Sequence, residues 1–66
     1  MVDTVEFSDC TCRIETDSAL LVRFADRDEA IWIPKSQVDD DSEVYKKGTS
    51  GILVITEWFA TEKGLI

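Results

Sequence analysis

The sequence predicts a small, mainly β domain, an SH3-like or OB-like barrel of four to five antiparallel strands with a short C-terminal helix. Its 66 residues are enough for one domain, so we expect a single small β domain over residues 1–66. Short apolar runs rich in β-branched and aromatic residues alternate with polar turns along most of the chain. The signals of a helix start and a helix end occur together only near the C-terminus.

The first predicted strand, over residues 4–14, changes phase part of the way along. Its two apolar sets are Val5 and Phe7, and then Cys10, Cys12 and Ile14. Neighbouring side chains of a strand point to opposite faces, so the two sets cannot share the core in one uninterrupted register. A bulge or a short turn around Ser8 and Asp9 would bring both sets to the inner face.

The next two predicted strands form a hairpin. A turn signal at residues 17–18 precedes the run Ala19–Phe24, and an acidic connection over residues 26–29 leads to residues 30–33. In the run Ala19–Phe24, the side chains that should face the core are Leu20, Val22 and Phe24. Pro34 ends the strand of residues 30–33 or places it at an edge. Because large apolar residues occupy both faces of residues 30–33, we expect this strand to be buried on two sides.

A long polar connection and a last strand follow. The connection covers residues 35–50, a length typical of functional or mobile loops. Three side chains could attach it to the body: Val38, Val44 and Tyr45. Gly51 then opens the continuous apolar run of residues 52–55, which is the pattern of a central strand.

The chain is expected to end in a short helix. Thr56 stands where an N-cap residue belongs. Gly64 and Leu65 fit the Schellman motif that commonly ends a helix. A helix this short is not stable alone, so it must dock through Trp58 or Phe59.

The charge balance limits both the partners and the chemistry. Fourteen acidic and seven basic residues give a formal net charge of −7, which repels nucleic-acid phosphates and anionic membranes and favours basic partners. The chain has no histidine, and so lacks the commonest general base and the commonest metal ligand. It also shows no glycine-rich phosphate loop and no activated nucleophile. We therefore expect a binding protein without a cofactor rather than an enzyme.

The same reading indicates a cytoplasmic protein. No apolar run approaches the roughly 18 residues of a membrane-spanning helix. The N-terminal residues are acidic and alternating, without the basic region and apolar block of a signal peptide. We expect no membrane binding and no direct nucleic-acid binding.

Cys10 and Cys12 are the candidate metal ligands. On a strand both thiols would point to one face. A structural zinc site needs four ligands, so these two would have to share a site across a dimer or add carboxylates. The alternative is a pair of reduced cysteines packed in or near the core, where a free cysteine behaves as a small hydrophobe.

The densest charge run covers residues 39–43. An EF-hand calcium loop is excluded, because Val44 stands at the position of its invariant glycine and Ser50 at that of its bidentate glutamate. The run could present carboxylates to a basic partner, or it could be a solvated loop. With the acidic hairpin connection, the candidate partner-binding residues are Asp26, Asp28, Glu29, Asp39, Asp40, Asp41 and Glu43.

Three stretches resemble a pattern in small phage- and prophage-encoded proteins. They are Ala19-Leu20-Leu21-Val22, Ile31-Trp32-Ile33-Pro34-Lys35-Ser36-Gln37-Val38 and Ile52-Leu53-Val54-Ile55-Thr56-Glu57-Trp58. The segment Trp32 to Gln37 carries most of the likeness. The resemblance implies a bacterial host cytoplasm and a protein of anti-CRISPR or host-defence-inhibitor type, and it implies no site residues.

Two functions are therefore expected. In the first, the protein is a phage-type inhibitor that binds a basic, nucleic-acid-handling host protein, such as a CRISPR effector, through acidic residues that imitate DNA phosphates. In the second, it is a small interaction or scaffold module without mimicry. That module would be a monomer or a homodimer, pairing through an edge strand near Pro34 or through the apolar helix face.

Overall fold

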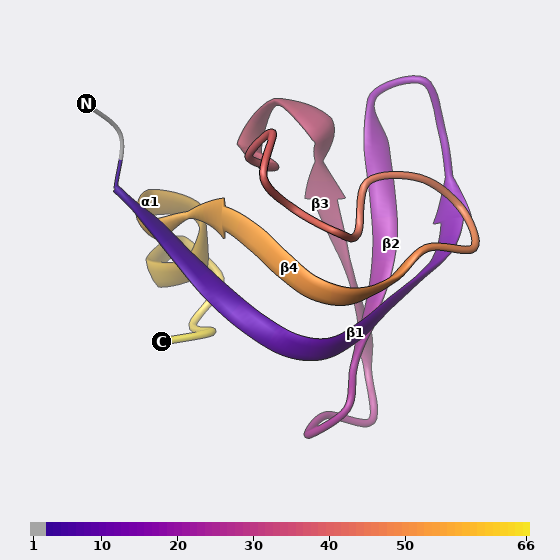
Figure 1. The fold of residues 1–66 in the computed structure, drawn as a ribbon. Helices are drawn as coiled ribbons and strands as arrows, with labels where there is room; N and C mark the ends of the chain where they lie inside the picture. Colours follow the sequence, from indigo (N-terminus) through magenta and orange to yellow (C-terminus); the bar gives the residue numbers. More distant parts are fainter. Residues whose placement is uncertain (1–2) are drawn as a thin grey trace.

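The computed structural model describes residues 3–66 and contains four strands followed by one helix (Figure 1). The elements are β1 (Thr4–Glu15), β2 (Ala19–Phe24), β3 (Ala30–Pro34), the 3-10 turn η1 (Lys35–Gln37), β4 (Ser50–Thr56) and α1 (Glu57–Glu62). All strand pairs are antiparallel, and the four strands form one sheet in the order β3-β2-β1-β4. The mainly β class and the C-terminal helix are confirmed. The sheet is open, and the structure shows no closed barrel within residues 3–66.

β1 is long and bent because it pairs with two strands along different parts of its length (Figure 1). Its register with β4 shifts between Phe7 and Cys10, where Asp9 has a φ of 57°. Aspartate adopts this left-handed conformation more readily than most residues. The predicted irregularity around Ser8 and Asp9 is confirmed. A second shift, against β2, lies between Cys12 and Ile14 and was not predicted.

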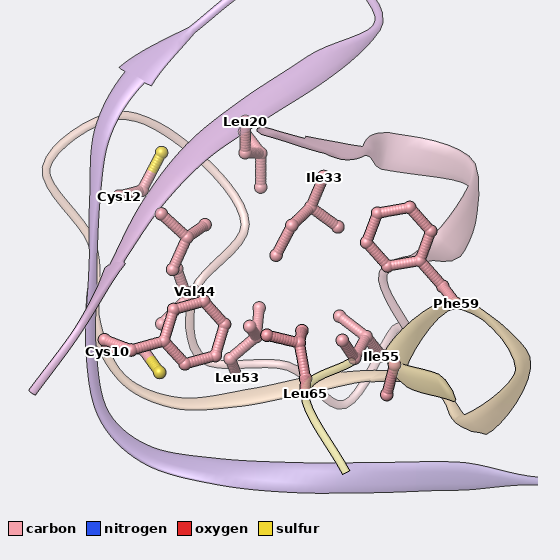
Figure 2. Close-up of a cluster of buried hydrophobic side chains, with 12 residues drawn as sticks. Cys10, Cys12, Leu20, Ile33, Val44, Leu53, Ile55, Phe59 and Leu65 are labelled. Carbon is pink, nitrogen blue, oxygen red and sulfur yellow. The ribbon is translucent and has the colours of Figure 1, made fainter. Parts of the chain in front are cut away.

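The core lies on the inner face of the curved sheet (Figure 2). Its members are Cys10, Cys12, Leu20, Val22, Phe24, Ile33, Val44, Leu53, Ile55, Phe59, Ala60 and Leu65. The rings of Phe7 and Phe24 add an edge-to-face contact with centroids 5.3 Å apart. The three predicted core positions of β2 are all confirmed. Alternation along β2 therefore positions this strand as expected.

β3 is buried on one side only, so the expectation of burial on both sides is wrong. Ile33 is fully buried, whereas Trp32 is 47% exposed. β3 lies at the edge of the sheet, and only its inner face meets the core. The Trp32 side chain on its other face points outward because no layer within residues 3–66 covers that face.

α1 begins and ends as its sequence predicts. The main-chain N–H of Phe59 donates to the Thr56 hydroxyl oxygen at 3.2 Å, which makes Thr56 the N-cap. At the other end the N–H of Leu65 donates to the carbonyl of Ala60 at 2.8 Å, and Gly64 has a φ of 69°. These are the features of a Schellman motif. No helix among residues 3–66 is long and apolar enough to cross a membrane.

The helix docks through one of the two predicted aromatic residues. Phe59 is buried in the core, whereas Trp58 is 64% exposed.

The long connection before β4 is attached to the body at some of the predicted points. Val44 is fully buried and Val38 forms an isolated bridge with Ile55, but Tyr45 is exposed.

Candidate partner-binding surfaces

The predicted acidic residues fall into two groups at opposite ends of β3. Asp26, Asp28 and Glu29 lie in the connection between β2 and β3, and residues 39–43 follow η1 at the other end (Figure 1). β3 has five residues and so spans about 16 Å. The structure therefore does not bring the seven candidate residues into one cluster.

The segment of residues 39–43 lies along the edge of β4 that β1 does not occupy. The N–H of Asp39 donates to the carbonyl of Val54 at 2.8 Å, and the N–H of Glu43 donates to the carbonyl of Ile52 at 2.8 Å. The main chain of the acidic segment thus satisfies carbonyls that an edge strand would otherwise leave open. Its position is fixed by β4.

Side chains of the same segment complete this attachment. The buried Ser42 hydroxyl oxygen accepts from the N–H of Val54 at 3.1 Å and donates to the carbonyl of Val44 at 2.8 Å. Glu43 Oε1 accepts from the N–H of Ile52 at 2.8 Å. The Glu43 carboxylate is therefore part of the fold and is only partly available to a partner.

The Asp39 side chain also forms a hydrogen bond within the segment, whereas the side chains of Asp40 and Asp41 do not. Asp39 Oδ2 accepts from the main-chain N–H of Asp41 at 3.0 Å, which is an Asx-type turn. The carboxylates of Asp40 and Asp41 are exposed and make no hydrogen bond among the described residues. Of the five residues in this segment, Asp40 and Asp41 are the ones free to contact a partner.

The hairpin group is exposed and lies beside other elements of the sheet. Asp26 lines a shallow hollow with Glu6 and Asp9 of β1, which the sequence did not place near it. Asp28 lines a different hollow on the outer face of the sheet. Glu29 is exposed in the same connection. The negative charge at this end therefore includes β1 carboxylates that sequence reasoning missed.

One ion pair forms within residues 3–66. Lys35 Nζ lies 2.7 Å from Glu15 Oε2, and the N–H of Lys47 also donates to Glu15. The Lys35 hydrogen bond and then the Lys47 N–H hold the pKa of the Glu15 carboxyl below its usual value. Every other described carboxylate lacks a salt-bridge partner, so most of the negative charge is uncompensated at the surface.

The structure places Cys10 and Cys12 in the core rather than in a surface site. Both are buried free thiols on the inner face of β1, as alternation predicts (Figure 2). Burial, then the charges of Asp26 and Asp9, raises the pKa of the Cys10 thiol to about 11. Metal ligation needs a thiolate. Within residues 3–66 no three Cys, Asp or Glu side chains are placed to hold a metal ion.

The surface that sequence reasoning missed is the outer face of β1, β2 and β3. Ile14, Leu21 and Trp32 lie side by side there, and Arg13 and Arg23 flank them. The alternation of β2 and β3 was a usable signal for Leu21 and Trp32.

The comparisons with known proteins find no matching family model, no matching curated protein and no matching solved structure.

Proposed function

We propose that the protein binds a basic, nucleic-acid-handling partner through exposed carboxylates and occupies the groove that nucleic acid would otherwise fill. The observation that carries this proposal is the single ion pair, Lys35 with Glu15, among the described residues of a chain with a net charge of −7. Charges that the fold does not neutralise internally are available to a partner. A basic surface is the complement of such a field.

The spacing of the free carboxylates supports the same proposal. Asp26, Asp28 and Glu29 are separated from Asp40 and Asp41 by the length of β3. The β2–β3 ladder holds one group and the hydrogen bonds to β4 hold the other. Nucleic acid likewise presents negative charges at intervals along a stiff backbone, and a protein that neutralises them releases counterions. Spaced charges on a small rigid body can compete for the same lysine and arginine side chains.

The proposal includes a biological setting from the sequence resemblance. The target is a basic host protein such as a CRISPR effector, in the cytoplasm of a bacterial host. The curved sheet is, in this proposal, an SH3-like or OB-like body. Asp39 and Glu43 contribute mainly by holding the acidic segment on β4, and Asp40 and Asp41 make the contacts.

Capture from a bacterial lysate tests the proposal. The immobilised protein is exposed to nuclease-treated lysate at about 0.1 M salt, and the retained proteins are eluted with salt and identified by mass spectrometry. We expect basic nucleic-acid-binding proteins that elute by about 0.5 M salt, where screening suppresses exposed charge pairs, and that added duplex DNA displaces. Retention of acidic proteins, or of proteins that resist both salt and duplex DNA, would contradict the proposal.

The exposed Trp58 side chain favours a second candidate function, a self-associating interaction module. Trp58 is 64% exposed on α1, while its neighbour Phe59 is buried. An exposed tryptophan is a common interface anchor. Sedimentation equilibrium separates the two functions. A dimer that Trp58→Ala dissociates supports the module, and a monomer at about 100 μM argues against it.

A further inference from the structure

Three apolar side chains form a continuous row across the outer face of the sheet. Ile14 of β1 pairs with Leu21 of β2, and Leu21 pairs with Trp32 of β3. Ile14 is 46% exposed and Trp32 is 47% exposed. Side chains on directly paired strand positions touch one another. The row is therefore one apolar surface contributed by three strands.

The register shift in β1 creates this row. Cys12 pairs with Val22, and both are buried on the inner face. After the shift Ile14 pairs with Leu21, whose side chain points away from the core because its neighbours in β2 point inward. A bulge places two residues of one strand opposite one residue of the other, and so re-aims the chain that follows. Without it, Ile14 would share the inner face with Cys12.

Two arginines stand beside the row. Arg13 and Arg23 line one hollow together with Ile14 and Leu21. Both arginines are exposed, and neither makes a salt bridge within residues 3–66. Two free guanidinium groups next to an apolar surface form a site that can hold a carboxylate and an apolar group together.

This face differs in charge from the rest of an acidic chain. The outward positions of β2 and β3 carry no carboxylate; they are Ala19, Leu21, Arg23, Ala30, Trp32 and Pro34. Asp28 reaches the hollow only from the hairpin connection. In a protein of net charge −7, the face between the two acidic groups is apolar and basic.

We propose that this face binds a segment of another protein that carries a carboxylate next to an apolar side chain. The carboxylate lies between the guanidinium groups of Arg13 and Arg23, and the apolar side chain packs on the row that ends at Trp32. Tryptophan and arginine are the residue types that most often dominate binding energy at interfaces. The site goes beyond the proposed function, because it lies on the outer face of the strands, shares only Asp28 with the acidic groups and takes a partner of the opposite charge.

Charge complementarity argues against a second copy as the occupant. Two copies related by a two-fold axis would bring two arginines per copy, Arg13 and Arg23, against one carboxylate, Asp28, among the residues that line this hollow. Each copy also brings a net charge of −7. A buried arginine without a carboxylate to pair with weakens an interface. An acidic segment of another protein therefore fits this face, whereas the same face of a second copy does not.

Selection from a displayed library of random peptides tests this site. The wild-type protein is the bait, and the double variant Arg13→Glu and Arg23→Glu removes peptides that bind elsewhere. We expect enriched peptides with Asp or Glu adjacent to a large apolar residue. For a synthetic peptide of the enriched sequence, Trp32→Ala should weaken binding about 30-fold, and Arg13→Gln with Arg23→Gln about 10-fold. Tyr45→Ala, at an exposed aromatic residue outside this hollow, is the matched control and should leave binding unchanged.

The remaining outcomes would overturn the proposal. They are no enrichment above an uncoated support, enrichment of basic peptides, and equal binding to the wild-type protein and the arginine variant. A dimer in sedimentation equilibrium that Trp32→Ala dissociates would show that a second copy covers this face. Thermal unfolding checks each variant, and the exposed arginine pair keeps the test valid if Trp32→Ala does not fold. Neutralising Asp40 and Asp41 should not change peptide binding, which separates this test from that of the proposed function.

Discussion

The hydroxyl oxygen of Ser42 accepts a hydrogen bond from the main-chain N–H of Val54 at 3.1 Å and joins the acidic segment to β4. Ser42 is buried although it lies between charged neighbours. Its hydroxyl also bonds the carbonyl and the N–H of Val44, so one side chain connects three places in the chain. A segment that reads as a solvated charge run is therefore also the cover of a sheet edge.

Replacing Ser42 by alanine should destabilise the protein. The buried N–H of Val54 would lose its acceptor, which costs about 1–3 kcal/mol of unfolding free energy. For a domain of this size that lowers the unfolding midpoint by several degrees or more. Ser36→Ala in η1 is the control, since Ser36 is exposed and makes no hydrogen bond among the described residues. Thermal unfolding followed by circular dichroism measures both, and equal midpoints would contradict the role given to Ser42.

Gly51 should tolerate a side chain less well than Gly48. Both have a positive φ, 131° and 89°, so alanine is strained at either position. At Gly51 a Cβ would also lie 2.5 Å from Glu43 Oε1, which the N–H of Ile52 holds in place, and 3.3 Å from Glu43 Cβ, whereas at Gly48 it meets nothing within 4 Å. Gly51→Ala should therefore lower the free energy of unfolding by more than Gly48→Ala, by about 1 kcal/mol or more. Urea unfolding compares the two, and a larger loss for Gly48→Ala would refute the proposed contact.

Thr56 should stabilise α1 through its hydroxyl group. That hydroxyl caps the N–H of Phe59 and donates to Gln37 Oε1 at 2.5 Å. Thr56→Ala should cost about 0.5–2 kcal/mol of unfolding free energy, and Thr56→Ser, which keeps the hydroxyl, should cost much less. Chemical denaturation resolves the difference. Similar losses for the two variants would mean that the methyl group of Thr56 matters more than its hydroxyl.

The buried thiols should make stability fall at alkaline pH. Burial raises the pKa of Cys10 from 9.0 to about 11, and burial also raises that of Cys12. The unfolded chain then loses these protons first, so the contribution of Cys10 is fully present below about pH 9 and is lost as the pH rises through about 11. Urea unfolding from pH 8 to 11 measures the decline. Cys10→Ala should show a shallower decline than the wild type, and an identical slope would exclude Cys10 as its source.

Local chemistry explains the part of the fold that the sequence predicts. The parity of Leu20 and Val22, the irregularity near Asp9, the N-cap at Thr56 and the positive φ of Gly64 all follow from a few neighbouring residues. Each depends on the conformational preference of one short stretch. Such features are therefore readable before any pairing is known.

The parts that were not predicted depend on strand pairing. Ile14 was expected on the inner face with Cys12, but the second register shift turns it outward, and Arg13 carries no turn signal that marks the shift. The exposure of Trp32 follows from the edge position of β3 in the strand order. The division of the acidic segment, with Glu43 bonded to Ile52 and with Asp40 and Asp41 free, follows from contact with β4. Spacing along the chain indicates which residues of a strand share a face, but it does not give the register shift, the strand order or the contact with β4.

A comparison of two variants with equal net charge tests the central claim most directly. One variant changes Asp26, Asp28, Asp40 and Asp41 to asparagine; the other changes Asp3, Asp17, Glu57 and Glu62 to the matching amides, all at exposed positions. The measurement is the amount of basic nucleic-acid-binding protein that each retains from nuclease-treated bacterial lysate, by quantitative mass spectrometry. The account predicts a loss of about 10-fold or more for the first variant and little change for the second. Equal losses would show that net charge alone causes retention, and would contradict a binding surface at the two ends of β3.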